Sequence, residues 1–142
     1  MSIAQRLTDQ GITLPDASAP AANYVPFVQV GNTLYVSGQI SRTDDGLIMG
    51  ILGENMSVED GAAAAQTCAL QLLAQVRAAC GGDIDRLVRV VKLTGFVNST
   101  KDFTDQPKVI NGCSLMLCIS CCLRLFAILR IHRSQRILQP SG

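Results

Sequence analysis

The sequence feature that most constrains the fold is a long amphipathic segment over Ser57–Gly82. Apolar residues recur through it at steps of three and four, the spacing of one face of an α-helix. Ser57 and Asp60 resemble a capping box at its start, and Gly81-Gly82 is typical of a helix end. The small residues over 62–65 let such a helix lie close to a sheet. The pattern therefore predicts one long helix near 57–80.

The segments around this helix predict the strands and the remaining helices. Residues 24–37 hold two apolar segments on either side of the two-residue turn Gly31-Asn32, which indicates a β-hairpin. Residues 87–97 are rich in β-branched residues and apolar on both faces, which favours a central strand. Short helices are expected after Ser2 and from about residue 105. This order indicates an α+β domain with its helices on one face of a sheet.

Composition divides the chain at about residue 112. The whole chain has 142 residues and a net charge of +1, which indicates one domain and favours neither nucleic acid nor a membrane surface as a partner. Residues 1–112 hold all eleven acidic residues and eight basic ones, a net charge of −3. Residues 113–142 hold no acid, four arginines, the single histidine and four of the six cysteines. We therefore expect a domain over 1–112 and a distinct apolar, Arg- and Cys-rich tail over 113–142.

The domain 1–112 resembles a known family along its whole length. The similarity lies in Asn23-Tyr24-Val25-Pro26, in Gly31–Ile40, in Gly81-Gly82-Asp83, in Val90–Asn98 and in Asp102–Gly112. Together, and in this order, these segments resemble the reactive intermediate deaminase (RidA, YjgF-like) family. The resemblance implies a chorismate-mutase-like α+β fold with a mixed sheet, assembled as a homotrimer with a cleft between each pair of subunits. It also implies a hydrolase. The charged first ten residues contain no apolar segment of a secretion signal, so a cytoplasmic location is expected.

The family's reaction suggests which residues to expect in the cleft. Family members hydrolyse 2-imino and 2-enamino acids to 2-oxo acids and ammonia, without a metal or an organic cofactor. Tyr24 matches the family's cleft tyrosine, and Ser37 and Gly38 match the Ser-Gly that lines the cleft at the end of a strand. We therefore expect Tyr24, Ser37 and Gly38 to bind the substrate. No His or acidic residue at a recognisable spacing supports Ser37 as a nucleophile.

The chain departs from the family pattern after Cys113-Ser114. The family continues with an Ala-Arg-Ser-like strand, a Leu-Pro turn and a strand that carries a glutamate, and none of these follows here. The arginine would bind the substrate's carboxylate bidentately, so its absence predicts impaired activity. A change of reading frame near Ser114 is the simplest account. The alternative function is a non-catalytic small-molecule binder or scaffold on the same fold.

Several structures remain open for the tail. Residues 113–123 are expected to continue the second helix, and 125–131 to supply at most one poor strand, which leaves the sheet short of the family's last pair. A zinc site at Cys118, Cys121, Cys122 and His132 is not favoured, because adjacent cysteines rarely bind one ion. A membrane span is not favoured either, because Arg124 interrupts the apolar segment. An exposed, aggregation-prone segment is the favoured interpretation.

Overall fold

The computed structural model describes residues 2–19, 23–117 and 125–131. The elements in chain order are α1 (Ile3–Asp9), β1 (Phe27–Val30), β2 (Thr33–Gln39), β3 (Arg42–Thr43), β4 (Gly46–Leu47), α2 (Val58–Ala79), the 3-10 helix η1 (Ile84–Arg86), β5 (Leu87–Gly95), α3 (Gln106–Leu117) and β6 (Leu125–Ile131). The α+β class is confirmed.

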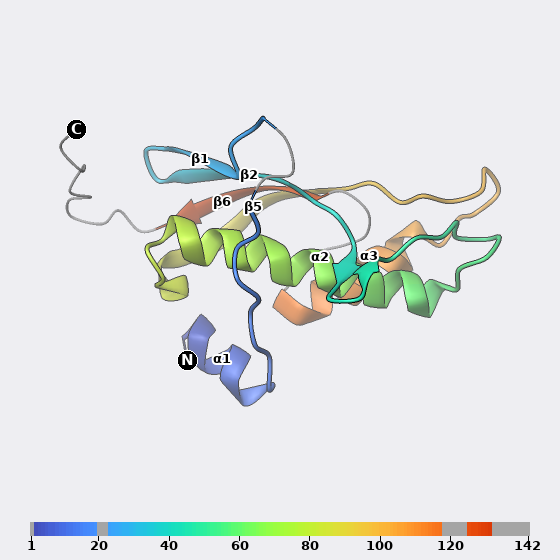
Figure 1. Cartoon of the computed structure of the whole chain (residues 1–142), viewed down its shortest axis with the longest axis horizontal. Coiled ribbons are helices and arrows are strands. Elements are labelled where there is room, and N and C mark those ends of the chain that lie inside the picture. The colour runs from blue at the N-terminus through green and yellow to red at the C-terminus, as the bar shows by residue number, and fades with distance from the viewer. Residues whose placement is uncertain (1, 20–22, 118–124, 132–142) are drawn as a thin grey trace.

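Four strands form the main sheet, in the order β1-β2-β6-β5. All three strand pairs are antiparallel, where a mixed sheet was expected. Strands β3 and β4 form a separate small hairpin. Figure 1 shows the three α-helices on one side of the sheet, with α2 running beneath it. The predicted helix-on-one-face arrangement is therefore confirmed.

Helix α2 begins and ends as its sequence indicates. The Ser57 hydroxyl oxygen accepts from the Asp60 N–H at 3.0 Å, and the same hydroxyl donates to the Asp60 carboxylate at 2.7 Å. The carboxylate therefore binds the cap's side chain, where a full capping box would bind its backbone N–H. At the other end, Gly81 N–H donates to Ala78 O and Gly82 N–H to Arg77 O, at 3.0 and 2.8 Å. These two bonds form a Schellman motif, and Gly81 has the positive φ that the motif needs at the first residue after the cap.

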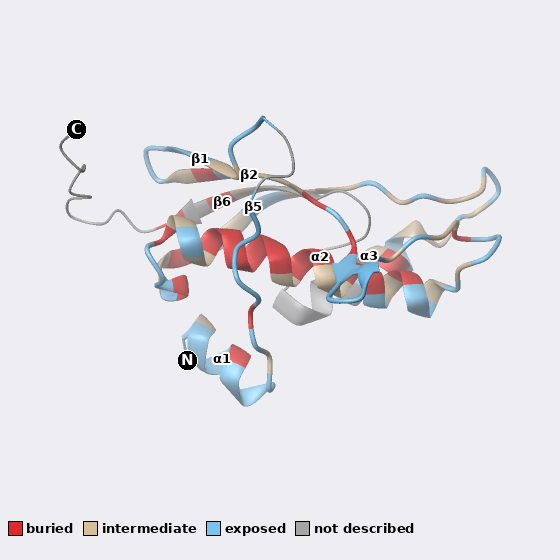
Figure 2. Cartoon of the chain, in the orientation of Figure 1, coloured by how far each residue is buried: buried red, intermediate tan, exposed pale blue. Residues whose placement is uncertain are grey.

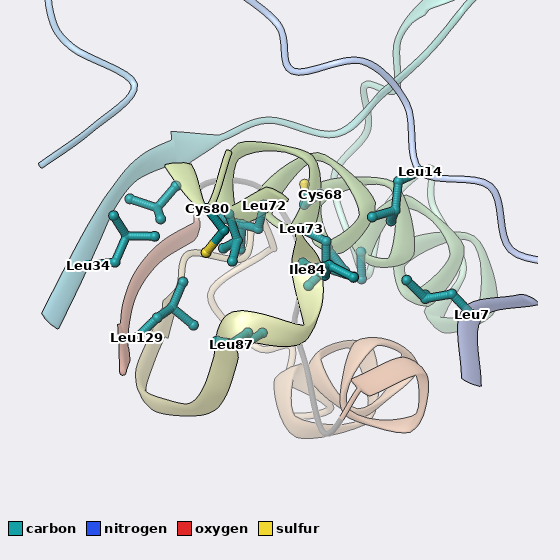
Figure 3. Packing of buried hydrophobic residues seen from close by; sticks show 14 of the residues in the cluster. Leu7, Leu14, Leu34, Cys68, Leu72, Leu73, Cys80, Ile84, Leu87 and Leu129 are labelled. Atoms are coloured by element: carbon teal, nitrogen blue, oxygen red, sulfur yellow. The ribbon is translucent and has the colours of Figure 1, made fainter. Parts of the chain in front are cut away.

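The hydrophobic core lies between α2 and the sheet. Figure 2 shows the buried positions of α2 gathered along the face beneath the strands. Leu34 from β2 and Leu129 from β6 pack with Leu72 from α2 in one cluster (Figure 3). Leu7 from α1 and Leu14 from the arm that follows it join the same cluster. The N-terminal segment is thus part of the domain's core.

The predicted central position of residues 87–97 is wrong. Strand β5 lies at the edge of the sheet and pairs with β6 alone among the described strands. Two register shifts in β5 turn Leu87, Val90 and Leu93 toward the helices and leave Val88 and Val91 exposed. The second apolar face of β5 indicated burial on both sides, but in the single chain that face is exposed to solvent.

The chain passes residue 112 inside a helix. Helix α3 continues past residue 112 to Leu117, and the rest of the helix expected to residue 123 lies outside the described residues. Leu125–Ile131 forms β6. This strand is better placed than the poor strand expected, because it lies between β2 and β5 and its Leu129 is 3% exposed. It is the single strand after α3 among the described residues. The domain boundary at 112 stays a prediction, and Cys118, Cys121, Cys122 and His132 lie outside the described residues.

No helix in the described ranges is long and apolar enough to cross a membrane.

Candidate functional site

The sequence-predicted site residues Ser37 and Gly38 form an irregularity in β2. Along this strand Val36 pairs with Ala127, whereas Gln39 pairs with Leu125. Two residues of β2 therefore stand opposite the single residue 126 of β6, which is a β-bulge. Bulges bend a strand, re-aim its side chains and are frequent beside active sites. Both residues are partly exposed, so this bend is accessible to a ligand.

The hydroxyl of Ser37 joins the bulge to the segment that carries Tyr24. It donates to the carbonyl oxygen of Val25 at 2.6 Å, and the Ser37 N–H donates to Pro26 O at 2.9 Å. Pro26 has no N–H, so β1 begins only at Phe27, and these two bonds hold the chain just before it. Tyr24, next to Val25, is 48% exposed. The structure therefore brings the backbones of all three predicted residues together at the end of the hairpin.

The Ser37 hydroxyl positions the segment before β1 through its bond to Val25 O. Its proton is donated to Val25 O, while the lone pairs of its hydroxyl oxygen remain able to accept a bond from a ligand. Ser37 forms no hydrogen bond with a described Asp or Glu. Its role as a cleft-lining hydroxyl stays a prediction.

Two glutamines that the sequence interpretation missed hold the far side of the bulge. Gln39, buried at the end of β2, donates to the Ser37 carbonyl at 3.0 Å. Gln71 is buried on α2 and donates to Ile40 O at 3.2 Å, which ties the strand's exit to the helix. A glutamine within the apolar stripe of a long helix was the available signal, because a buried amide must find a backbone partner.

The register of β6 determines what the opposite strand offers to this site. Residue 126, a phenylalanine, stands opposite the bulge, and Arg130 pairs with Thr33 at the other end of β2. Four residues along a strand span roughly 13 Å. The backbone of Arg130 is therefore remote from the bulge.

The two resolved pKa shifts lie elsewhere. Burial raises the pKa of the Cys80 thiol at the end of α2. Hydrogen bonds from the backbone of α1, chiefly from the Ala4 N–H, lower the pKa of Asp85. Neither residue forms a hydrogen bond with Tyr24, Ser37 or Gly38. Across the described part of the chain, no three His, Cys, Asp or Glu residues gather as metal ligands would.

Known proteins resemble this chain over most of its length. The family model described as "YjgF/chorismate mutase-like, putative endoribonuclease" matches residues 4–135. Protein TCP17 of Trypanosoma cruzi is 50% identical over 113 residues, which cover 79% of this chain and 70% of that protein. The match to the family model extends past residue 112 and includes β6.

Two solved structures share the fold. The protein Atu1372 of Agrobacterium tumefaciens, a protein of unknown function, is 36% identical with a TM-score of 0.77, and the match covers 90% of this chain and 91% of that one. A "putative endoribonuclease" of Shewanella oneidensis MR-1 has a TM-score of 0.81 over 92% of this chain and 100% of that one, and its 24% identity shows the fold alone. The family model matches most of the chain, and Protein TCP17 is 50% identical over 70% of its own length, so the chain belongs to the YjgF/chorismate mutase-like family.

Proposed function

We propose that this domain is built to bind 2-imino or 2-enamino acids and to hydrolyse them to 2-oxo acids and ammonia. In this reaction the oxygen of water bonds to the iminium carbon, the C–N bond breaks, and the nitrogen leaves as ammonia. The substrate already carries the electrophilic carbon, so the protein needs to hold its carboxylate, orient the water and exclude other geometries. No metal or organic cofactor enters this proposal.

The bulge at Ser37-Gly38 is the observation that carries the proposal. It places a hydroxyl oxygen and a glycine backbone at one bend of β2, and the Ser37–Val25 bond sets the segment of Tyr24 beside them. A glycine at this point lets a small ligand approach the backbone closely. Tyr24 supplies a phenol that can cover the ligand and donate a hydrogen bond.

The uncovered face of the sheet supports assembly into the family's homotrimer. Large apolar residues lie exposed on the strands, away from the helices: Val28, Val30, Tyr35, Val88 and Val91. Exposed apolar residues grouped on one sheet face are typical of an interaction surface. A second copy of this chain seated on that face would close the open side of the hairpin and complete a cleft between subunits.

The register of β6 favours impaired turnover, and with it the second candidate, a small-molecule binder without catalysis. Phe126 stands where β6 passes the bulge, and Arg130 is four residues further along. A phenylalanine cannot provide the planar pair of donors that a carboxylate needs. One charge-assisted hydrogen bond contributes about 1.5–3 kcal/mol and a bidentate pair contributes more, so losing the pair slows turnover by about 10²-fold or more.

RNA cleavage, which the family's description as "putative endoribonuclease" names, is less well supported. Binding to RNA depends on cations facing the phosphates, and residues 1–112 carry a net charge of −3.

The test is an assay that couples a pyridoxal-phosphate dehydratase to the purified chain and measures release of 2-oxo acid. The chain is compared with a version in which a family-like ending is restored in frame after Ser114. We expect activity in the restored version and little in the chain as it stands. Equal rates would show that the missing arginine does not limit turnover.

Variants of the restored version test the site itself. Tyr24→Phe and Ser37→Ala should lower kcat/KM. Tyr35→Phe is the matched control, since Tyr35 is 46% exposed on the same hairpin, lies on the proposed subunit face and not at the bulge, and keeps its apolar ring when only the hydroxyl is removed. If Tyr24→Phe and Tyr35→Phe have the same effect, Tyr24 has no role in binding. If the restored version lacks imine hydrolysis but still binds a 2-oxo acid, the binder function is supported.

A further inference from the structure

A pocket lies on the helix side of the molecule, apart from the bulge in β2. It has a volume of about 400 Å³ and is open to solvent. Its walls are the N-terminal arm at Pro15 and Asp16, the β3–β4 hairpin at Arg42 and Asp44, and α2 at Leu70. Figure 1 shows the arm rising from α1 and crossing α2. The pocket shares no residue with Tyr24, Ser37 and Gly38.

The arm is tied to α2 by side chains. Gln75, buried on α2, donates to Ser18 O at 2.8 Å. Arg77 donates to Pro15 O at 2.9 Å, and its guanidinium lies 3.7 Å from the Asp16 carboxylate. An extended segment with three such contacts forms a fixed wall, so the pocket does not depend on a ligand for its shape.

The hairpin wall is tied to the same helix. The Arg42 N–H donates to the Thr67 hydroxyl at 3.2 Å, and Gln71 holds the carbonyl of Ile40. Thr67, Gln71 and Gln75 recur at intervals of four residues and so lie along one face of α2. This polar row binds the two walls to one rigid element, and an arrangement of this kind is pre-organised for binding.

The charges in the pocket remain partly unpaired. Within the described residues, neither Arg42 nor Asp44 forms an ion pair. Asp16 contributes a second carboxylate, which is itself near Arg77. A ligand with only a negative charge would be attracted by Arg42 and repelled by the carboxylates of Asp16 and Asp44. A ligand that carries one charge of each sign would be complementary to both Arg42 and Asp44.

We propose that this pocket binds a free α-amino acid with an apolar side chain. The ligand's carboxylate lies on the Arg42 guanidinium, where a bidentate pair can form. Its ammonium group donates to Asp44, and its side chain covers Leu70 and Pro15. The pocket is at the small end of the range for ligand sites, which suits a molecule of this size.

The experiment is an NMR titration of the ¹⁵N-labelled full chain with L-leucine. Two matched probes each lack one charge: 4-methylpentanoate has no ammonium group, and 3-methylbutylamine has no carboxylate. We expect saturable shifts for leucine at amides of residues 16–18, 42–47 and 67–71, and at least about tenfold weaker binding of either probe. Equal binding of 4-methylpentanoate, or shifts spread over the whole chain, would overturn the proposal.

Charge-removing variants test the assigned contacts. Arg42→Gln and Asp44→Asn should each weaken leucine binding by at least about tenfold. Asp45→Asn removes the same charge from the neighbouring residue, which does not line the pocket, and Lys101→Gln removes one positive charge elsewhere. The controls should bind as the unaltered chain does. Amides outside the pocket report whether each variant is folded, and a folded Asp44→Asn variant with unchanged affinity would contradict the assignment.

Discussion

Replacing Gly61 with alanine tests how tightly the start of α2 packs on the loop before it. A Cβ at this position would lie 2.8 Å from Cδ2 of Leu52 and 3.3 Å from Cγ1 of Val109. Both neighbours are fully buried at 0% exposure. Leu52 is also fixed at its backbone, since its N–H donates to Asn98 O at 3.0 Å and its carbonyl accepts from the Thr100 N–H at 2.9 Å. The added methyl group therefore needs space that neither neighbour readily gives.

Two opposing terms determine the size of the effect. Alanine favours a helix interior over glycine by about 1 kcal/mol. An extra carbon in a well-packed core costs about 1–3 kcal/mol. We expect Gly61→Ala to lower the free energy of unfolding by about 1 kcal/mol, from the difference of these terms. Leu52→Ala alone should cost about 2–5 kcal/mol. In the Leu52→Ala background the 2.8 Å contact with Leu52 is gone and only the 3.3 Å contact with Val109 remains. Gly61→Ala should therefore be stabilising there.

The assay is urea unfolding at one fixed protein concentration, because self-association would change the apparent stability. Ala63→Gly is the matched control: Ala63 is exposed on the same turn of α2, so it reports helix propensity without packing. We expect a coupling free energy of about 1–3 kcal/mol between positions 61 and 52. Additive effects, or a stabilising Gly61→Ala in the unaltered chain, would refute the packing argument.

Three further predictions concern the hairpin, the N-terminal helix and β6. Ser37→Ala should lower the free energy of unfolding by about 1 kcal/mol in the same urea assay, because the carbonyl of Val25 loses its donor. Ser37→Thr keeps the hydroxyl and should lose much less stability. The lowered pKa of Asp85 means that its contribution to docking α1 is complete above the ordinary value of 3.8 and is lost as the pH falls through the lowered pKa. Proteolysis of α1 should therefore accelerate at acid pH, and Asp85→Asn should remove that pH dependence; persistence of the dependence would assign it to another group. Leu129→Ala should cost about 2–5 kcal/mol and the half-buried Ile128→Ala clearly less, whereas equal costs would contradict the position of β6 in the sheet.

The elements with strong local signals were predicted well. Helix α2 has its cap, its apolar period and its two terminal glycines within one segment, so nothing distant was needed to place it. The hairpin was predicted for the same reason, from Gly31-Asn32 between two apolar segments. The strand starting at Leu87 was recognised as a strand and wrongly placed at the centre of the sheet, because alternation cannot distinguish a face buried by the chain from one left for a partner.

The site was predictable in part. The Ser-Gly pair was identified by resemblance, but its bulge depends on pairing with β6, about ninety residues later in the chain. The polar row of α2 was missed, because the partners of Gln71 and Gln75 are backbone carbonyls that no sequence pattern marks. Contacts of this kind are determined by tertiary packing.

The place of β6 also constrains the order in which the domain can fold. Residues 33 and 130 are register partners, so the sheet closes only by joining segments nearly a hundred positions apart. During synthesis the facing edges of β2 and β5 remain unpaired until β6, the strand between them, leaves the ribosome. Open edges next to exposed valines are a site of aggregation, and such long-range pairing is slow. Closure of the sheet therefore depends on a strand that the chain supplies only after α3.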